Sequence, residues 1–128
     1  MGRLQKEQSL ARRGEQMDGQ EEKTQIITNP SGRELKEHGS YRFPFLVSRE
    51  RLSRYETGSF LWHWHTEIEF TLVTDGCMIY QINDSCIRLN AGDALFGNSG
   101  TLHSAHRADE GDCRYISITF SPRLLYGY

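Results

Sequence analysis

The residues best suited to chemistry lie between Gly58 and Gly76, in the stretch GSFLWHWHTEIEFTLVTDG. His63, His65 and Glu69 are polar residues within an otherwise apolar run of β-forming residues. Because side chains alternate between the two faces of a strand, these three odd-numbered residues are predicted to point the same way. Two imidazoles and a carboxylate on one face can converge on a small ion or ligand.

A fourth candidate ligand, His103, follows a glycine-containing turn and lies on a later β-prone segment. Three imidazoles and one carboxylate would leave one or two coordination positions of a divalent metal open, and Zn, Mn, Fe and Ni are the candidates. A second interpretation stays open, in which the same residues hydrogen-bond an effector without metal. Tyr80 and Arg88 are further candidates for such an effector pocket.

Six even-numbered positions of the same stretch are apolar: Phe60, Trp62, Trp64, Ile68, Phe70 and Leu72. A strand that needs cover on both faces belongs in a closed or two-layered β structure. Trp62 and Trp64 are expected on the outside of this structure, where helices or a second subunit would bury them.

Short β-prone segments separated by turn residues fill the chain after Tyr41. Asp75-Gly76 and Asn83-Asp84 are tight-turn signals between such segments. Many short strands at near-regular spacing indicate an all-β antiparallel barrel or sandwich. The expected strands cover residues 43–49, 51–55, 61–65, 67–74, 77–82, 85–89, 94–97, 102–107 and 115–120.

The first forty residues are mostly polar. Residues 1–28 carry balanced, alternating charges and are expected to be a disordered tail before the core. Ser31 followed by Glu34 has the spacing of a capping box, which predicts a short helix over residues 33–38. His38 lies in this segment, outside the expected barrel, and is assigned no role.

Composition narrows the functional classes. The chain has 128 residues, enough for one domain. Its net charge of −2 does not indicate the positively charged surface that nucleic-acid binding needs. Its apolar runs are too short to span a bilayer, and no secretory signal is visible. Three cysteines, Cys77, Cys86 and Cys113, lack CxxC spacing and are expected to be reduced, which favours a cytoplasmic protein.

The glycines, histidines and glutamate of the first stretch together resemble the first motif of the cupin superfamily. That motif runs glycine, His-x-His, glutamate and glycine, and it is matched by Gly58, His63, His65, Glu69 and Gly76. Only the first spacer departs, since it has four residues where five are usual.

The second cupin motif is matched in part. Gly92, Gly100 and His103 hold their expected places, while Asn98 replaces a proline and Arg107 replaces an asparagine. The resemblance implies a small jelly-roll-type antiparallel β-barrel, with a polar N-terminal tail and one short helix. It also implies that the three histidines and the glutamate named above face inward.

The sequence around these motifs is similar to that of the N-terminal sensing domain of AraC-type transcription regulators. The similar segments are HWHTEIEFTLVTDG, INDSCIRLNAGDALFGNSGTLHSAH and CRYISITFSPRLL. The resemblance implies a ligand-binding domain for a small polar metabolite or sugar-like effector, forming a homodimer away from membranes. DNA binding would belong to a C-terminal helix-turn-helix domain that this chain lacks. The implied divisions are a tail over 1–40, a cupin barrel over 41–121 and the start of a connection over 122–128.

A metal-dependent cupin enzyme, such as a dioxygenase or isomerase, is the alternative function. It would need an open metal position and a catalytic acid or base besides the ligands. Tyr80 is the one nearby candidate for that group. The FSPRLL ending, by family analogy, favours a regulator without enzymatic activity.

Overall fold

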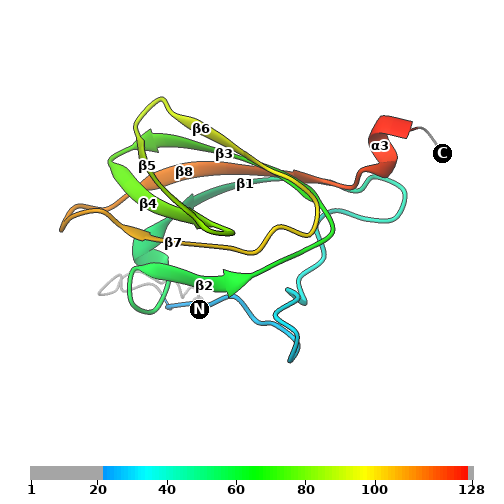
Figure 1. The fold of residues 1–128 in the computed structure, drawn as a ribbon, viewed down its shortest axis with the longest axis horizontal. Helices are drawn as coiled ribbons and strands as arrows, with labels where there is room; N and C mark the ends of the chain where they lie inside the picture. The colour runs from blue at the N-terminus through cyan, green and yellow to red at the C-terminus, as the bar shows by residue number, and fades with distance from the viewer. Residues whose placement is uncertain (1–21, 127–128) are drawn as a thin grey trace, which may run out of the picture.

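The protein folds as two four-stranded antiparallel sheets that face each other (Figure 1). The structure, a computed structural model, describes residues 22–126; the stretch 1–21 of the expected tail lies outside the described residues. One sheet has the strand order β1-β8-β3-β6 and the other β2-β7-β4-β5. The strands are β1 (Phe45–Arg51), β2 (Ser59–His63), β3 (Ile68–Asp75), β4 (Cys77–Ile82), β5 (Ser85–Asn90), β6 (Ala94–Gly97), β7 (His103–Arg107) and β8 (Arg114–Phe120).

The predicted all-β, jelly-roll-type fold is confirmed, and every expected strand except 51–55 overlaps an observed one. Alternation explains the packing, because Tyr115 and Thr119 of β8 are buried while Ile116 and Ile118 point to the opposite face. The inward residues of both sheets form one apolar core: Leu52, Tyr55, Phe60, Val73, Met78, Tyr80, Leu89, Ala105, Cys113 and Tyr115. Within residues 22–126, each strand pairs only with strands of its own sheet, so the two sheets do not close into a barrel.

The two turn signals have different roles. Asn83 adopts a φ of 51°, which asparagine tolerates, and the two-residue turn after Ile82 pairs β4 with β5 as a hairpin. Asp75-Gly76 instead carries the chain from β3 in one sheet to β4 in the other. Gly76 has a φ of 77° at this corner, a conformation that residues with a Cβ rarely adopt.

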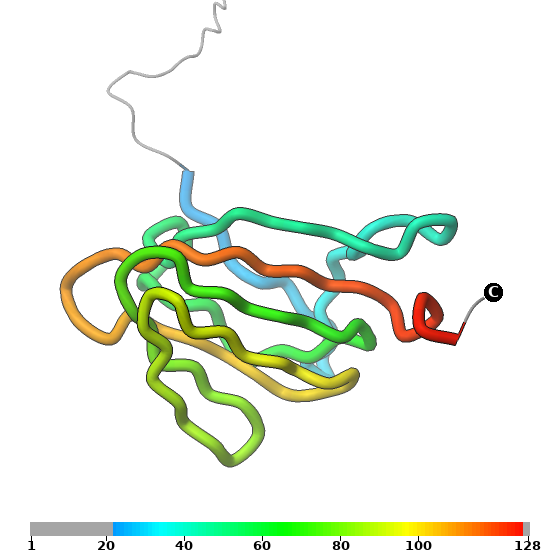
Figure 2. Tube along the Cα trace, turned by 90° about the horizontal axis from the view of Figure 1, so that it is seen from above, coloured from blue at the N-terminus to red at the C-terminus, as the bar shows by residue number. Residues whose placement is uncertain are grey.

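The helix predicted over 33–38 is wrong. The Asn29 side chain accepts hydrogen bonds from the backbone N–H groups of Ser31 and Arg33 and holds a turn. The Glu34 N–H then donates to the Trp64 carbonyl, so this backbone pairs with the sandwich instead of coiling. The short helix of the structure is α3 (Arg123–Tyr126), near the C-terminal end of the chain (Figure 2).

The strand predicted over 51–55 is also wrong. β1 continues to Arg51 and is followed by the 3-10 helix η2 (Leu52–Arg54). Leu52 is completely buried, and its N–H donates to the Cys113 carbonyl. Burial of Leu52 in the core turns the chain away from the β1 direction and ends the strand.

The sequence analysis placed Phe60 on the face opposite His63, and this is wrong, because Phe60 is buried in the core. Pairing of β2 with β7 shifts register between Phe60 and His63, so both of these residues point inward. Leu61 and Trp62 lie between them and are exposed. The bulge therefore moves Phe60 into the core without turning His63 out of the interior.

Residues 24–38, which we call the strap, run along the free edge of β2 and lie below it in Figure 1. Parallel bridges join Thr24 to Tyr55 and Arg33 to Trp64. Trp64 donates its indole N–H to the Ser31 carbonyl and lies under the Arg33 guanidinium. Trp64 is thus partly covered by the chain's own strap, which corrects the expectation that it faces helices or another subunit.

Candidate metal and effector site

Two histidines meet across adjacent strands. His63 is the last residue of β2, His103 is the first of β7, and the two are direct partners in the register. Their ring centroids lie 4.2 Å apart, and both side chains are buried. Phe60 packs edge-on against both rings and closes the site on the core side.

His65 and Glu69 complete the group from the other sheet's side. His65 lies in the link between β2 and β3, and Glu69 is the second residue of β3. Glu69 Oε1 lies 2.8 Å from His65 Nε2 and 3.6 Å from His103 Nε2. One donor nitrogen from each of His63, His65 and His103 lies within 4.8 Å of the other two. The structure therefore brings together all four residues that the sequence analysis singled out as ligands.

Backbone carbonyls set the orientation of the three rings. Nδ1 of His63, His65 and His103 lies 2.8, 3.2 and 2.8 Å from the carbonyls of Leu61, Glu67 and Thr101. Because a carbonyl can only accept, Nδ1 carries the proton of the neutral His63 and His103 rings, and their Nε2 atoms offer a lone pair. His65 Nε2 lies 2.8 Å from the ionised Glu69 carboxylate and donates to it, so His65 would release this proton on binding a metal. The buried His103 Nε2 has no hydrogen-bond partner within residues 22–126. Three fixed imidazole donors and a carboxylate fit a divalent metal.

The charges of the site suit ligand roles. Burial by itself raises the pKa of Glu69, but His103 and His65 outweigh it and hold that pKa well below its usual range. Burial and the neighbouring His103 lower the pKa of His63 to about 4, so His63 is neutral at pH 7. The second Glu69 oxygen accepts hydrogen bonds from Ser117 and Thr71, which fix the carboxylate. An ionised Glu69 and a neutral His63 are the forms that bind metal cations.

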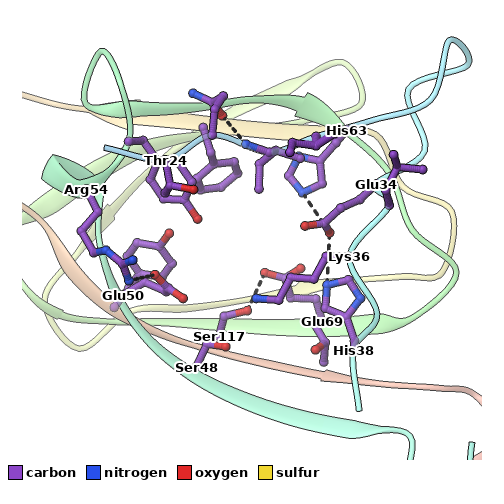
Figure 3. A pocket seen from close by; sticks show the side chains of 18 residues that line it. Thr24, Glu34, Lys36, His38, Ser48, Glu50, Arg54, His63, Glu69 and Ser117 are labelled. Atoms are coloured by element: carbon purple, nitrogen blue, oxygen red, sulfur yellow. Dashed lines mark hydrogen bonds and ion pairs between the residues drawn. The ribbon is translucent and has the colours of Figure 1, made fainter. Parts of the chain in front are cut away.

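These residues adjoin a cavity of about 510 Å³ between the strap, β2 and the inner face of the β1-β8-β3 sheet. Figure 3 shows His63, Glu34, His38 and Glu69 gathered at one end and Glu50 and Arg54 at the other. An ion pair of 3.7 Å joins Arg54 to Glu50. Hydroxyl groups and aromatic rings supply much of the remaining wall: Thr24, Ser48, Ser117, Thr119, Tyr55, Phe60 and Tyr115.

The other sequence candidates lie elsewhere. Tyr80 is buried against His103, with parallel rings whose centroids are 6.0 Å apart, and it does not line the cavity. Burial and the charge of Glu69 raise the pKa of Tyr80 well above its usual range. Arg88 is exposed and bonds to Asn90 and Cys77, away from the site.

Two further residues at the site, Glu34 and His38, were not predicted from the sequence. The Glu34 carboxylate lies 3.1 Å from His38 Nε2 and 3.9 Å from His63 Nε2. Glu67 lies 3.4 Å from His38 Nδ1. Burial lowers the pKa of His38, but Glu34 and Glu67 reverse this effect and raise it to about 9. The spacing of Glu34 and His38 suggested only a helix cap, and nothing local indicated that the strap folds back over the site.

Comparison with known proteins places the chain in a family. The sequence profile described as AraC-like ligand binding domain matches residues 48–128. The chain belongs to the AraC-like ligand-binding domain family. A relative in Bacillus subtilis (strain 168), the uncharacterized HTH-type transcriptional regulator YdeC, is 37% identical over 100 residues. The match covers 78% of this chain and 34% of the relative, so this AraC-like domain spans about a third of that regulator.

Solved structures with a similar fold include a protein described as a cupin domain. A Thermotoga maritima protein described as a predicted oxalate decarboxylase superposes with a TM-score of 0.54 at 25% identity, covering 59% of this chain and 65% of that one. The Cnp3 cupin domain of Schizosaccharomyces pombe gives 0.58 at 10% identity, covering 68% and 59%. At 10% identity, the similarity to the Cnp3 cupin domain supports a shared fold only. Within residues 22–126, no helix is long and apolar enough to cross a membrane.

Proposed function

We propose that this AraC-like domain is the effector-sensing part of a bacterial transcription regulator. The cavity that ends at His63 and Glu69, next to His65 and His103, is the observation that carries the proposal. Its volume of about 510 Å³ suits a small molecule, and a few polar groups converge there among aromatic walls. The family and the regulator relative support the same function.

We propose further that the three histidines and Glu69 hold one divalent metal, with Zn, Mn, Fe and Ni as candidates. The lone pair on His103 Nε2, which lacks a hydrogen-bond partner in the described chain, supports this assignment. When bound, the ion would supply a Lewis-acid point for an oxygen atom of the effector. The backbone carbonyls that hold Nδ1 of each ring would keep the nitrogen donors oriented.

The cavity favours a small polar metabolite or a sugar-like effector. Ser48 and Thr119 offer hydroxyl groups along one wall, and Arg54 offers guanidinium donors at the far end. Tyr55, on another part of the wall, offers an apolar ring face for a carbon skeleton. Such a pairing of hydroxyl donors and ring faces binds polyhydroxylated molecules.

The response would pass to a DNA-binding domain beyond this chain. Residues 122–128 would begin the connection, and residues 1–40 would form the N-terminal part. An effector that prefers one arrangement of the two domains would shift their equilibrium and change DNA binding. Such a protein works in the cytoplasm, where its DNA lies.

The enzyme alternative is less well supported. It needs an acid or base beside the ligands, and Tyr80 was the candidate for that group. Tyr80 lies outside the cavity lining, and its pKa well above the usual range makes it a poor proton donor at neutral pH. Sensing without catalysis is therefore the function we propose.

Effector binding can be tested by thermal unfolding with a panel of sugars, sugar acids and small hydroxy acids. A true effector at about 100 times its Kd adds about 2.7 kcal/mol of stability. The melting temperature of a domain of this size should then rise by several degrees. The same compound should have much less effect on the His63→Ala variant, in which the cavity end is altered. A panel without any stabilising compound, or one that stabilises both proteins equally, would contradict the proposal.

A homodimer is proposed through the outer face of the β1-β8-β3-β6 sheet. Val47, Ile118, Phe70 and Phe96 are successive partners across its four strands and form one apolar row. Val47, Phe70 and Phe96 are among the exposed large apolar residues. An apolar patch of this kind on a soluble protein is typical of an interaction surface, and a second copy would bury it.

Phe70→Asp is expected to weaken self-association by roughly 30-fold, because a buried unpaired carboxylate costs about 2 kcal/mol or more. Sedimentation equilibrium of the variant and the parent protein measures this shift. Trp62→Asp, at an exposed position on the other sheet, tests the alternative contact face expected from the sequence and should leave the dimer intact. Equal association of Phe70→Asp and the parent protein would remove this face from the interface.

A further inference from the structure

The strap brings a buried carboxylate to the histidine group from outside the two cupin motifs. Hydrogen bonds between the Glu34 N–H and the Trp64 carbonyl, and between the Trp64 N–H and the Gly32 carbonyl, fasten this part of the strap to the chain beyond β2. The Glu34 side chain is only 6% exposed. Burial of a carboxylate is costly unless cations or hydrogen-bond donors compensate for the lost water. Glu34 is therefore expected to have positively charged partners at this position.

One distance places Glu34 within reach of an ion bound at His63. Metal–ligand bonds to nitrogen and oxygen are about 2.1 Å long, so two donors on one ion lie no more than about 4.2 Å apart. Glu34 Oε1 lies 3.9 Å from His63 Nε2, within this limit. Glu34 also lies with His38 and His65 in a second group whose donor atoms are all within 4.8 Å of one another.

His38 holds the Glu34 carboxylate in this place. His38 Nε2 lies 3.1 Å from Glu34 Oε1, while Nδ1, on the other side of the ring, lies 3.4 Å from Glu67 Oε1. The ring also packs at 4.9 Å from the His65 ring. His38 is therefore fixed from several sides and orients Glu34 toward His63.

We infer that Glu34 is an additional ligand, delivered by the strap, of the divalent ion at His63, His65, His103 and Glu69, and that His38 is its positioning residue. This inference rests on the proposed metal site and adds a donor to it. The ion would then join the strap to both sheets, because Glu69 comes from one sheet and His63 and His103 from the other. Metal binding should consequently hold the strap closed over the cavity.

The first test is Zn²⁺ affinity, measured for the full chain by competition with a chelating dye. Glu34→Gln keeps the size of the side chain but removes its charge, and is expected to weaken Zn²⁺ binding by about 10- to 100-fold. Glu37→Gln, at an exposed position three residues along the strap, is the matched control and should bind Zn²⁺ like the parent protein. Circular dichroism of the metal-free variants checks that each is folded.

The second test is trypsin cleavage after Lys36, an exposed strap residue, with and without Zn²⁺. Zn²⁺ should slow this cleavage at least tenfold in the parent protein and in Glu37→Gln, but much less in Glu34→Gln. The effect of Zn²⁺ on cleavage of the parent protein tests the inference even if Glu34→Gln does not fold.

The outcomes separate the two proposals. Normal Zn²⁺ affinity in Glu34→Gln, or a parent strap that Zn²⁺ does not protect, would overturn the role of Glu34 and leave the four-residue metal site standing. Two Zn²⁺ ions per chain in the parent protein, with one lost in Glu34→Gln, would also overturn it, because Glu34 would then serve a separate ion. No Zn²⁺ binding by the parent protein would overturn both proposals.

Discussion

The double substitution His63→Ala/His103→Ala is expected to lower Zn²⁺ affinity by at least about 100-fold. Loss of a residue that merely supports a metal ligand already costs about 10- to 100-fold, and this variant loses two proposed donors. Only His65 and Glu69 would remain of the original four. Isothermal titration of chelator-treated protein, with elemental analysis of the untreated protein, measures the effect.

His106→Ala is the matched control for this experiment. His106 lies on β7, three residues beyond His103, and its side chain is exposed on the outer side of the fold. Its removal should leave Zn²⁺ affinity unchanged. Equal metal content in the double variant and the parent protein would exclude His63 and His103 as ligands.

Gly76→Ala is expected to destabilise the fold by at least about 3 kcal/mol, which would be a severe effect for one methyl group. A Cβ at this position would collide with the backbone carbonyl oxygen of Asp112. Asp112 cannot move aside easily, since its carboxylate accepts hydrogen bonds from the N–H groups of Ser53 and Cys113. The positive φ of 77° adds about 1–2 kcal/mol of backbone strain.

Gly92→Ala distinguishes the effect of the steric collision from that of the backbone strain. Gly92 also has a positive φ, of 95°, but a Cβ there would meet no atom within 4 Å. Its substitution should cost only the strain of about 1–2 kcal/mol. Urea unfolding of both variants gives the comparison, and equal losses of stability would show that close packing at the Gly76 corner is not important.

Local sequence patterns predicted the strands well because each strand carries its own signal. Alternation within β8 and the Asn83-Asp84 hairpin depend on residues close in sequence, and both were predicted. The inward direction of His63 was predicted from parity, although parity failed for Phe60 in the same strand. A one-residue bulge separates the two, and a bulge depends on how β2 pairs with β7, which a single strand's sequence does not specify.

The contribution of the strap could not be predicted for a different reason. Ser31 and Glu34 have the spacing of a capping box, and local propensity therefore favoured a helix. The pairing partner that overrides this propensity is Trp64, whose indole bonds to a carbonyl 33 residues earlier in the chain. Long-range contacts of this kind placed Glu34 and His38 at the site, whereas His63, His65, Glu69 and His103 could be found from motif spacing.

The most direct test of the proposed site is long-range ¹H–¹⁵N NMR of the histidine side chains, before and after an equimolar addition of Zn²⁺. We expect His63 and His103 to carry their proton on Nδ1 in the metal-free protein. When Zn²⁺ binds, the Nε2 signals of His63, His65 and His103 should all change strongly, while His106 stays unchanged. Unchanged Nε2 signals from His63 and His103 in a protein that has bound Zn²⁺ would contradict a metal centre built from these strands.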